Sequence, residues 1–189
     1  MTLSRREAVQ RVAAILGGAL VGGSALWTGR AHASSGPRLL QEADAAFLDE
    51  VAETILPATN TPGAKAAKVG AFMVVMVTDC YDEADQKIFK DGMRALDDGA
   101  RQAFTLGFLE ATPAQRTTLL TEVDREQKEY MDRRRSGEPV HFFRMMKELT
   151  LLGYFTSEVG ATQALRYSAI PGRFDPCVDY QPGERSWAP

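Results

Sequence analysis

Apolar residues recur at the spacing of an α-helix along most of this chain, and this periodicity is the feature that most restricts its fold. A typical stretch carries apolar residues three and four positions apart, at Phe47, Leu48, Val51, Ala52 and Ile55. Such spacing places the side chains on one face of a helix, whereas a half-buried strand would alternate. The pattern predicts further helices over about 66–81, 88–100, 113–135 and 138–158, with a short continuation over 104–109. We therefore expect an all-α fold, a compact bundle of about five main helices.

Two of these helices have recognisable start signals. Thr112 precedes Pro113, and Gln115 follows at the third position of the expected helix. This arrangement predicts a capping box, in which the Thr112 hydroxyl and the Gln115 side chain each satisfy a backbone N–H at the helix start. Asp44 is expected to cap the first helix in a similar way.

The last 20 residues have a different character. Pro171, Pro176 and Pro182 lack a backbone N–H and restrict their neighbours, so regular helix is excluded there. We expect an irregular, extended C-terminal arm over 170–189. Its spaced apolar residues are candidates for docking, either on the helical domain itself or on a partner: Phe174, Val178, Tyr180 and Trp187.

The N-terminal segment resembles a bacterial export signal. Arg5 and Arg6 are adjacent, residues 12–29 carry no charge, and Ala31 and Ala33 form an A-x-A cleavage signature. The arginine pair predicts a twin-arginine signal peptide over 1–33, followed by a linker over 34–43 and a helical domain over 44–169. The twin-arginine route carries folded proteins, so the mature chain is expected in the periplasm.

Two alternatives remain for this segment. A general secretory signal could contain two arginines by chance. A retained membrane anchor would need about 20 strongly apolar residues, but this run has 18 uncharged residues of which five are glycine. Cleavage is therefore favoured over anchoring.

Charge and composition restrict the partners. The chain has 22 basic and 25 acidic residues, of which four arginines and one glutamate lie in the first 33 positions. The mature chain therefore carries 18 basic and 24 acidic residues, a net charge of −6. Its one basic cluster, residues 133–135, lacks the interleaved aromatics that stack on bases, so no nucleic-acid partner is expected.

Two cysteines, Cys80 and Cys177, would both enter an oxidising compartment, and both are disulfide candidates. An intrachain bridge would join the arm to the second helix. The alternative links Cys177 to a partner and leaves Cys80 reduced and buried on an apolar helix face. Neither cysteine belongs to a C-x-x-C pair, so covalent haem is excluded in this chain.

Signals for catalysis are nearly absent. Glu138 and His141 form half of a carboxylate-bridged di-iron signature, but His141 is the only histidine after the signal segment, so the second half cannot exist. No G-x-S-x-G, G-x-G-x-x-G or P-loop pattern occurs. We therefore expect no catalytic, cofactor-binding or metal-binding residues in this chain.

Several segments together resemble one family. They are residues 53–64 (ETILPATNTPGA), 77–81 (VTDCY), 153–161 (GYFTSEVGA), 164–167 (ALRY) and 171–178 (PGRFDPCV). They are similar to the gluconate 2-dehydrogenase subunit 3 family, and the resemblance covers nearly the whole mature chain. The first and third segments are the distinctive ones.

This resemblance implies a small, non-catalytic periplasmic subunit. Its expected partner is a large flavoprotein of the glucose-methanol-choline (GMC) oxidoreductase type, which holds FAD and oxidises a sugar or sugar acid. A multihaem cytochrome c subunit often completes such membrane-associated complexes. The small subunit often carries the signal read by the twin-arginine translocase for the pair. The alternatives from the residues alone are a free-standing periplasmic helical binding protein and a small hydrolase.

Overall fold

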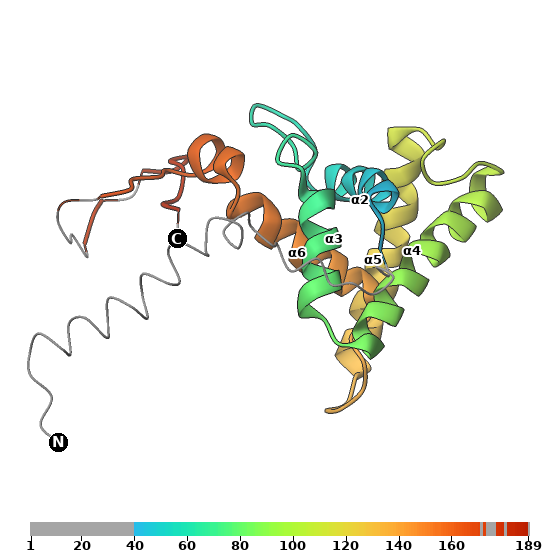
Figure 1. The fold of residues 1–189 in the computed structure, drawn as a ribbon. Coiled ribbons are helices and arrows are strands. Elements are labelled where there is room, and N and C mark those ends of the chain that lie inside the picture. The colour runs from blue at the N-terminus through green and yellow to red at the C-terminus, as the bar shows by residue number, and fades with distance from the viewer. Residues whose placement is uncertain (1–39, 171, 173–176, 180, 189) are drawn as a thin grey trace, which may run out of the picture. The chain divides into compact units, whose positions relative to one another are not determined.

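The computed structural model describes residues 40–170, 172, 177–179 and 181–188, which form five α-helices and one π-helical turn (Figure 1). These are α2 (Glu42–Ile55), α3 (Val69–Cys80), α4 (Glu83–Phe104), α5 (Pro113–Arg133), α6 (Phe142–Phe155) and η2 (Gly160–Ala164). Within these residues there is no strand, and the all-α bundle of about five main helices is confirmed. The expected signal peptide and two docking candidates, Phe174 and Tyr180, lie outside the described residues.

Helix α6 is the centre of the bundle, because it contacts each of α2, α3, α4 and α5. Its buried residues include Phe143, Met146 and Leu149. They pack with fully buried side chains of the other helices and of the loop before α5: Leu48, Val51, Val69, Met73, Val77, Phe89 and Phe108. Among the described residues, none of the helices has the length and hydropathy needed to cross a membrane.

The α2–α3 pair is the most extensive contact between helices. Gly70, in the first turn of α3, lies directly against the backbone of α2, where Ala45 and Asp49 are its neighbours. The Asp49 carboxylate accepts a hydrogen bond of 2.7 Å from the Gly70 N–H, which satisfies one of the free donors at the start of α3. The helix begins at Val69 instead of near 66 because Lys68 adopts a left-handed backbone (φ 55°).

A glutamate organises the loop that joins these two helices. The Glu53 carboxylate accepts hydrogen bonds from the N–H groups of Ala58 (2.9 Å) and Lys65 (2.8 Å). The hydroxyl of Tyr154 in α6 donates to the Pro62 carbonyl at 2.6 Å. These bonds fix the 56–65 loop to α2 at one side and to α6 at the other.

Ion pairs link α2 to the loop and to α5. The Glu50 carboxylate contacts both Lys65 and Arg116, and the Arg116 side chain is almost fully buried. Partial burial alone would raise the pKa of Glu50, but its bonds to Lys65 and the charge of Arg116 lower that pKa overall. Arg116 also donates to the carbonyls of Phe108 and Leu109, so it ties the loop before α5 to α2.

Helix boundaries agree with the sequence patterns at one site and differ at others. The capping box at α5 is present, with the Thr112 N–H donating to the Gln115 side chain at 2.9 Å. The expected Asp44 cap is wrong. Gln41 is the N-cap of α2, and Asp44 is the third helical residue, whose carboxylate accepts from the Gln41 N–H at 2.8 Å.

The expected helical continuation over 104–109 is also wrong. Thr105 adopts a left-handed conformation (φ 61°) and ends α4. The Asp97 carboxylate then accepts from the Phe108 N–H at 2.8 Å and holds the chain in a turn, with Phe108 fully buried. Likewise α6 begins at Phe142 and not near 138, because His141 serves as its N-cap.

Candidate functional site

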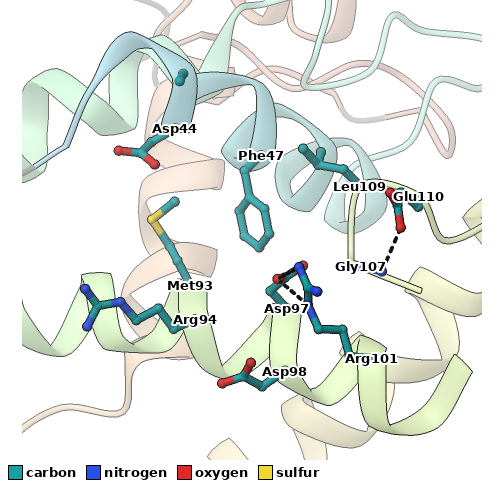
Figure 2. Close-up of a pocket in the computed structure, with 11 residues that line it drawn as sticks. Asp44, Phe47, Met93, Arg94, Asp97, Asp98, Arg101, Gly107, Leu109 and Glu110 are labelled. Carbon is teal, nitrogen blue, oxygen red and sulfur yellow. Dashed lines mark hydrogen bonds and ion pairs between the residues drawn. The ribbon is translucent and has the colours of Figure 1, made fainter. Parts of the chain in front are cut away.

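A cleft of about 560 Å³ lies between α2, α4 and the 107–110 loop (Figure 2). Phe47 and Met93 give it an apolar floor, and Leu109 stands at its rim with 48% of its surface exposed. Its remaining lining is mostly charged: Asp44, Arg94, Asp97, Asp98, Arg101 and Glu110.

Two carboxylates of this cleft, Asp97 and Glu110, accept hydrogen bonds from nearby groups of the same chain. Asp97 accepts from the Phe108 N–H and from the Arg101 Nε at 2.9 Å. The backbone bond to Phe108, followed by the bond and charge of Arg101, lowers the pKa of Asp97. Glu110 accepts from the Gly107 N–H at 3.1 Å. Asp97 and Glu110 thus hold the 107–110 loop in place.

His141 has a structural role at the start of α6. Its Nδ1 accepts a hydrogen bond of 3.2 Å from the Phe143 N–H, and its ring stacks on Phe142 with 4.6 Å between centroids. Burial lowers the pKa of His141, and the charge of Glu126 opposes this effect. Glu138 is also engaged locally, since its carboxylate accepts from the Arg135 N–H. Within the described part of the chain, no group of three His, Cys, Asp or Glu residues could hold a metal ion.

The His141 cap predicts a pH-dependent stability. Protonated Nδ1 cannot accept from Phe143, and the folded-state pKa lies below the ordinary value, so the folded state binds fewer protons than the unfolded state. The contribution of the His141 cap to the free energy of unfolding is therefore complete above about pH 6.5. It is lost as the pH falls through the pKa of His141 in the folded state. Urea unfolding of the mature chain should show a loss of about 1 kcal/mol, the worth of an N-cap, between pH 7.5 and 5.

His141→Asn is the matched control for this measurement, because asparagine caps helices well and does not titrate. We expect the variant to lose clearly less stability than the wild type over the same range. Parallel pH profiles for the two proteins would contradict the assigned role. No other histidine complicates the comparison in the mature chain.

The two cysteines are free and exposed in the structure. The expectation of a buried Cys80 is wrong, because it is the last residue of α3, where the helix leaves the core. Its Sγ lies 4.0 Å from the Met76 sulfur. Cys177 lies in the C-terminal arm. Both the intrachain bridge and the link from Cys177 to a partner stay predictions.

Non-reducing electrophoresis of the protein isolated from its native host checks these pairings. A band at the combined mass of two subunits, lost on adding thiol, would identify a link between subunits. A Cys80–Cys177 peptide found by mass spectrometry would identify the intrachain bridge. We expect one of these two results for a protein that enters an oxidising compartment, as the signal segment predicts, and two alkylatable thiols in the isolated protein would contradict both.

The end of the arm folds back onto the segment that follows α6. The backbones of Arg166 and the 186–188 segment pair at 2.8 and 2.7 Å, and the Arg166 guanidinium lies 4.5 Å from the centre of the Trp187 ring. Arg166 also pairs with Glu184 at 3.3 Å, and Arg185 donates to the Gln163 carbonyl at 2.8 Å. We call these contacts the C-terminal clasp.

For Trp187, the clasp corresponds to one of the two expected alternatives, docking on the same chain. One face of Trp187 is engaged by Arg166 of the same chain, although 58% of the residue remains exposed. Val178 lies in the arm within the loop that the clasp closes and is 64% exposed. The role of Arg166 has no local signal in the sequence, because its partners Glu184 and Trp187 are about 20 residues away.

Three large apolar residues are exposed on two helices of the bundle. Val75 of α3 is 56% exposed, and Leu151 and Leu152 of α6 are 44% and 47% exposed. Helices α3 and α6 are in contact (Figure 1). Single exposed apolar side chains are common on protein surfaces, so these residues do not by themselves define a binding surface.

The described residues thus form an all-helical domain. A family model for gluconate 2-dehydrogenase subunit 3 matches residues 42–172, and the chain belongs to this family. The family name denotes a subunit of a dehydrogenase complex, so the chain is of a type that has partner subunits. No curated protein and no solved structure matched the chain.

Proposed function

We propose that this chain is the non-catalytic small subunit of a membrane-associated, FAD-dependent gluconate or sugar dehydrogenase. The observation that carries the proposal is the family match, which spans all five α-helices and η2. The large subunit would be a GMC-type flavoprotein that holds FAD and oxidises the substrate. A multihaem cytochrome c would be a third subunit that takes up the electrons.

The role proposed for the small subunit is to bind the flavoprotein before export and to support its folding or stability. The signal segment supports this role, because a twin-arginine signal serves proteins that fold in the cytoplasm.

Purification of the tagged chain from its native host tests the proposal. We expect a large flavoprotein to co-purify, with the flavin absorbance and a sugar or sugar-acid dehydrogenase activity in the same fraction. The isolated mature chain should lack both the absorbance and the activity. Hydrolase or dehydrogenase activity of the isolated chain, or its recovery without any flavoprotein, would overturn the proposal.

A further inference from the structure

The C-terminal clasp is attached to one short segment of the chain. Every hydrogen bond, ion pair and ring contact of residues 181–188 lies within that stretch or reaches residues 162–166. The shortest are the two backbone bonds at Arg166 and the bond from Arg185 to the Gln163 carbonyl. None of these contacts reaches α2, α3, α4, α5 or α6, so the clasp is not fastened to the five main helices.

Burial contributes little to the clasp. Among the described residues that follow Gly160, none is buried, and Trp187 keeps 58% of its surface exposed. In α6, by contrast, Met146 and Leu149 are almost fully buried. Because hydrophobic stabilisation scales with the apolar area removed from water, the clasp gains little from the effect that holds the helices together.

The polar contacts of the clasp are exposed or incomplete. About a third of each side chain in the Arg166–Glu184 pair is exposed (34% and 37%), and ion pairs in such positions contribute little stability. The contact between the Arg166 guanidinium and the Trp187 ring is also weak where water reaches it. The Arg166 Nε is buried without a hydrogen-bond partner, which opposes closure because the group has lost its water. Closing the arm also costs the conformational entropy of the residues between its ends.

We propose that the C-terminal clasp is a strap that opens and closes while the helical bundle stays folded. Segments with few buried apolar contacts and solvent-exposed hydrogen bonds open at a much smaller free energy than the core of the same protein. Opening separates residues 181–188 from 162–166 and uncovers the Trp187 ring and the Arg166 guanidinium together. The proposal concerns this chain alone and does not rest on the function proposed above.

Trp187 allows the strap to be followed separately from the bundle. The chain has two tryptophans, so Trp27→Phe in the full chain leaves Trp187 as the only one. Its fluorescence then reports the clasp, whereas far-UV circular dichroism reports the helices. In urea, we expect the fluorescence to change over a broad range that begins at low urea while the dichroism stays constant, because opening the clasp exposes little surface. Coincident transitions would overturn the proposal, since arm and bundle would then unfold as one cooperative unit.

Arg166→Gln in the same background removes both the ion pair and the cation above the ring. We expect the Trp187 emission of this variant, without urea, to shift to that of the unfolded chain, with the helical dichroism unchanged. Arg94→Gln is the matched control, because Arg94 is an exposed arginine of α4 that pairs with Asp91 at 3.2 Å. This control should keep the emission of the parent protein. Wild-type emission in Arg166→Gln, or loss of its helical signal, would contradict the strap.

Hydrogen exchange gives a second measurement that needs no variant. The backbone N–H groups of Arg166 and Ala188 are bonded across the clasp, so they exchange whenever the clasp opens. After correction for intrinsic rates, we expect them to exchange at least about 100-fold faster than the N–H of Leu149 in the interior of α6. Equal protection at these positions would overturn the proposal, because the clasp would then open only when the bundle unfolds.

Discussion

Gly70→Ala is expected to destabilise the folded domain by about 3 kcal/mol or more, the upper range for inserting a methyl group into a packed site. A Cβ atom at this position would overlap the Ala45 carbonyl oxygen and would lie 2.7 Å from the Asp49 nitrogen. Both are backbone atoms of α2, which cannot rotate away as a side chain can. The two helices would have to separate along the most extensive contact in the bundle.

Thermal unfolding of the mature chain measures this effect. For a domain of this size, a loss of about 3 kcal/mol lowers the melting temperature by roughly 6–12 °C. The Asp49 cap at the start of α3 would be strained as well, because its Oδ1 lies 2.8 Å from the same Cβ position. An unchanged melting temperature would show that α2 and α3 are further apart than described.

Gly99→Ala is the control for this substitution. Gly99 lies in the interior of α4, and a Cβ atom there meets only the Leu119 side chain, at 3.3 Å. That methyl group can shift slightly, and alanine favours a helix interior by up to about 1 kcal/mol over glycine. We expect Gly99→Ala to be neutral or stabilising. If Gly70→Ala destabilises the domain and Gly99→Ala does not, the loss is due to the close approach of α2 and α3 at Gly70.

These contacts also explain what the sequence could predict. The helix start at Thr112 follows from residues within one turn of each other, and it was predicted correctly. The end of α4 was not predicted correctly. Thr105 reverses the chain there because the Asp97 carboxylate accepts a hydrogen bond from the Phe108 N–H and the Phe108 side chain packs in the core. Apolar periodicity indicates which face of a helix is buried. It does not indicate that the Asp97 carboxylate will bind the backbone of Phe108, eleven residues further along the chain.

Two surface features were not predicted. The exposed side of α3 was not, although the run over 74–77 has more apolar residues than one buried helix face needs. The clasp was not visible, since it joins Arg166 to Glu184 and Trp187 across an arm that has no periodicity. Proline spacing predicted an irregular arm, and it could not predict where that arm returns.

Replacing both Arg5 and Arg6 by lysine is expected to leave most of the flavoprotein subunit in the cytoplasm. In the proposed function, the arginine pair of the small subunit is the address that the twin-arginine translocase would read. A partner that depends on this address must be bound before export, so it should be lost from the periplasm together with the small subunit. Cell fractionation, with flavin absorbance and dehydrogenase activity in each fraction, provides the measurement.

Arg11→Lys is the matched control, because it makes the same chemical change in the same segment outside the pair. We expect export of both subunits to continue in this variant. If the flavoprotein reaches the periplasm in normal amount when Arg5 and Arg6 are lysine, it has its own route and the export role is wrong.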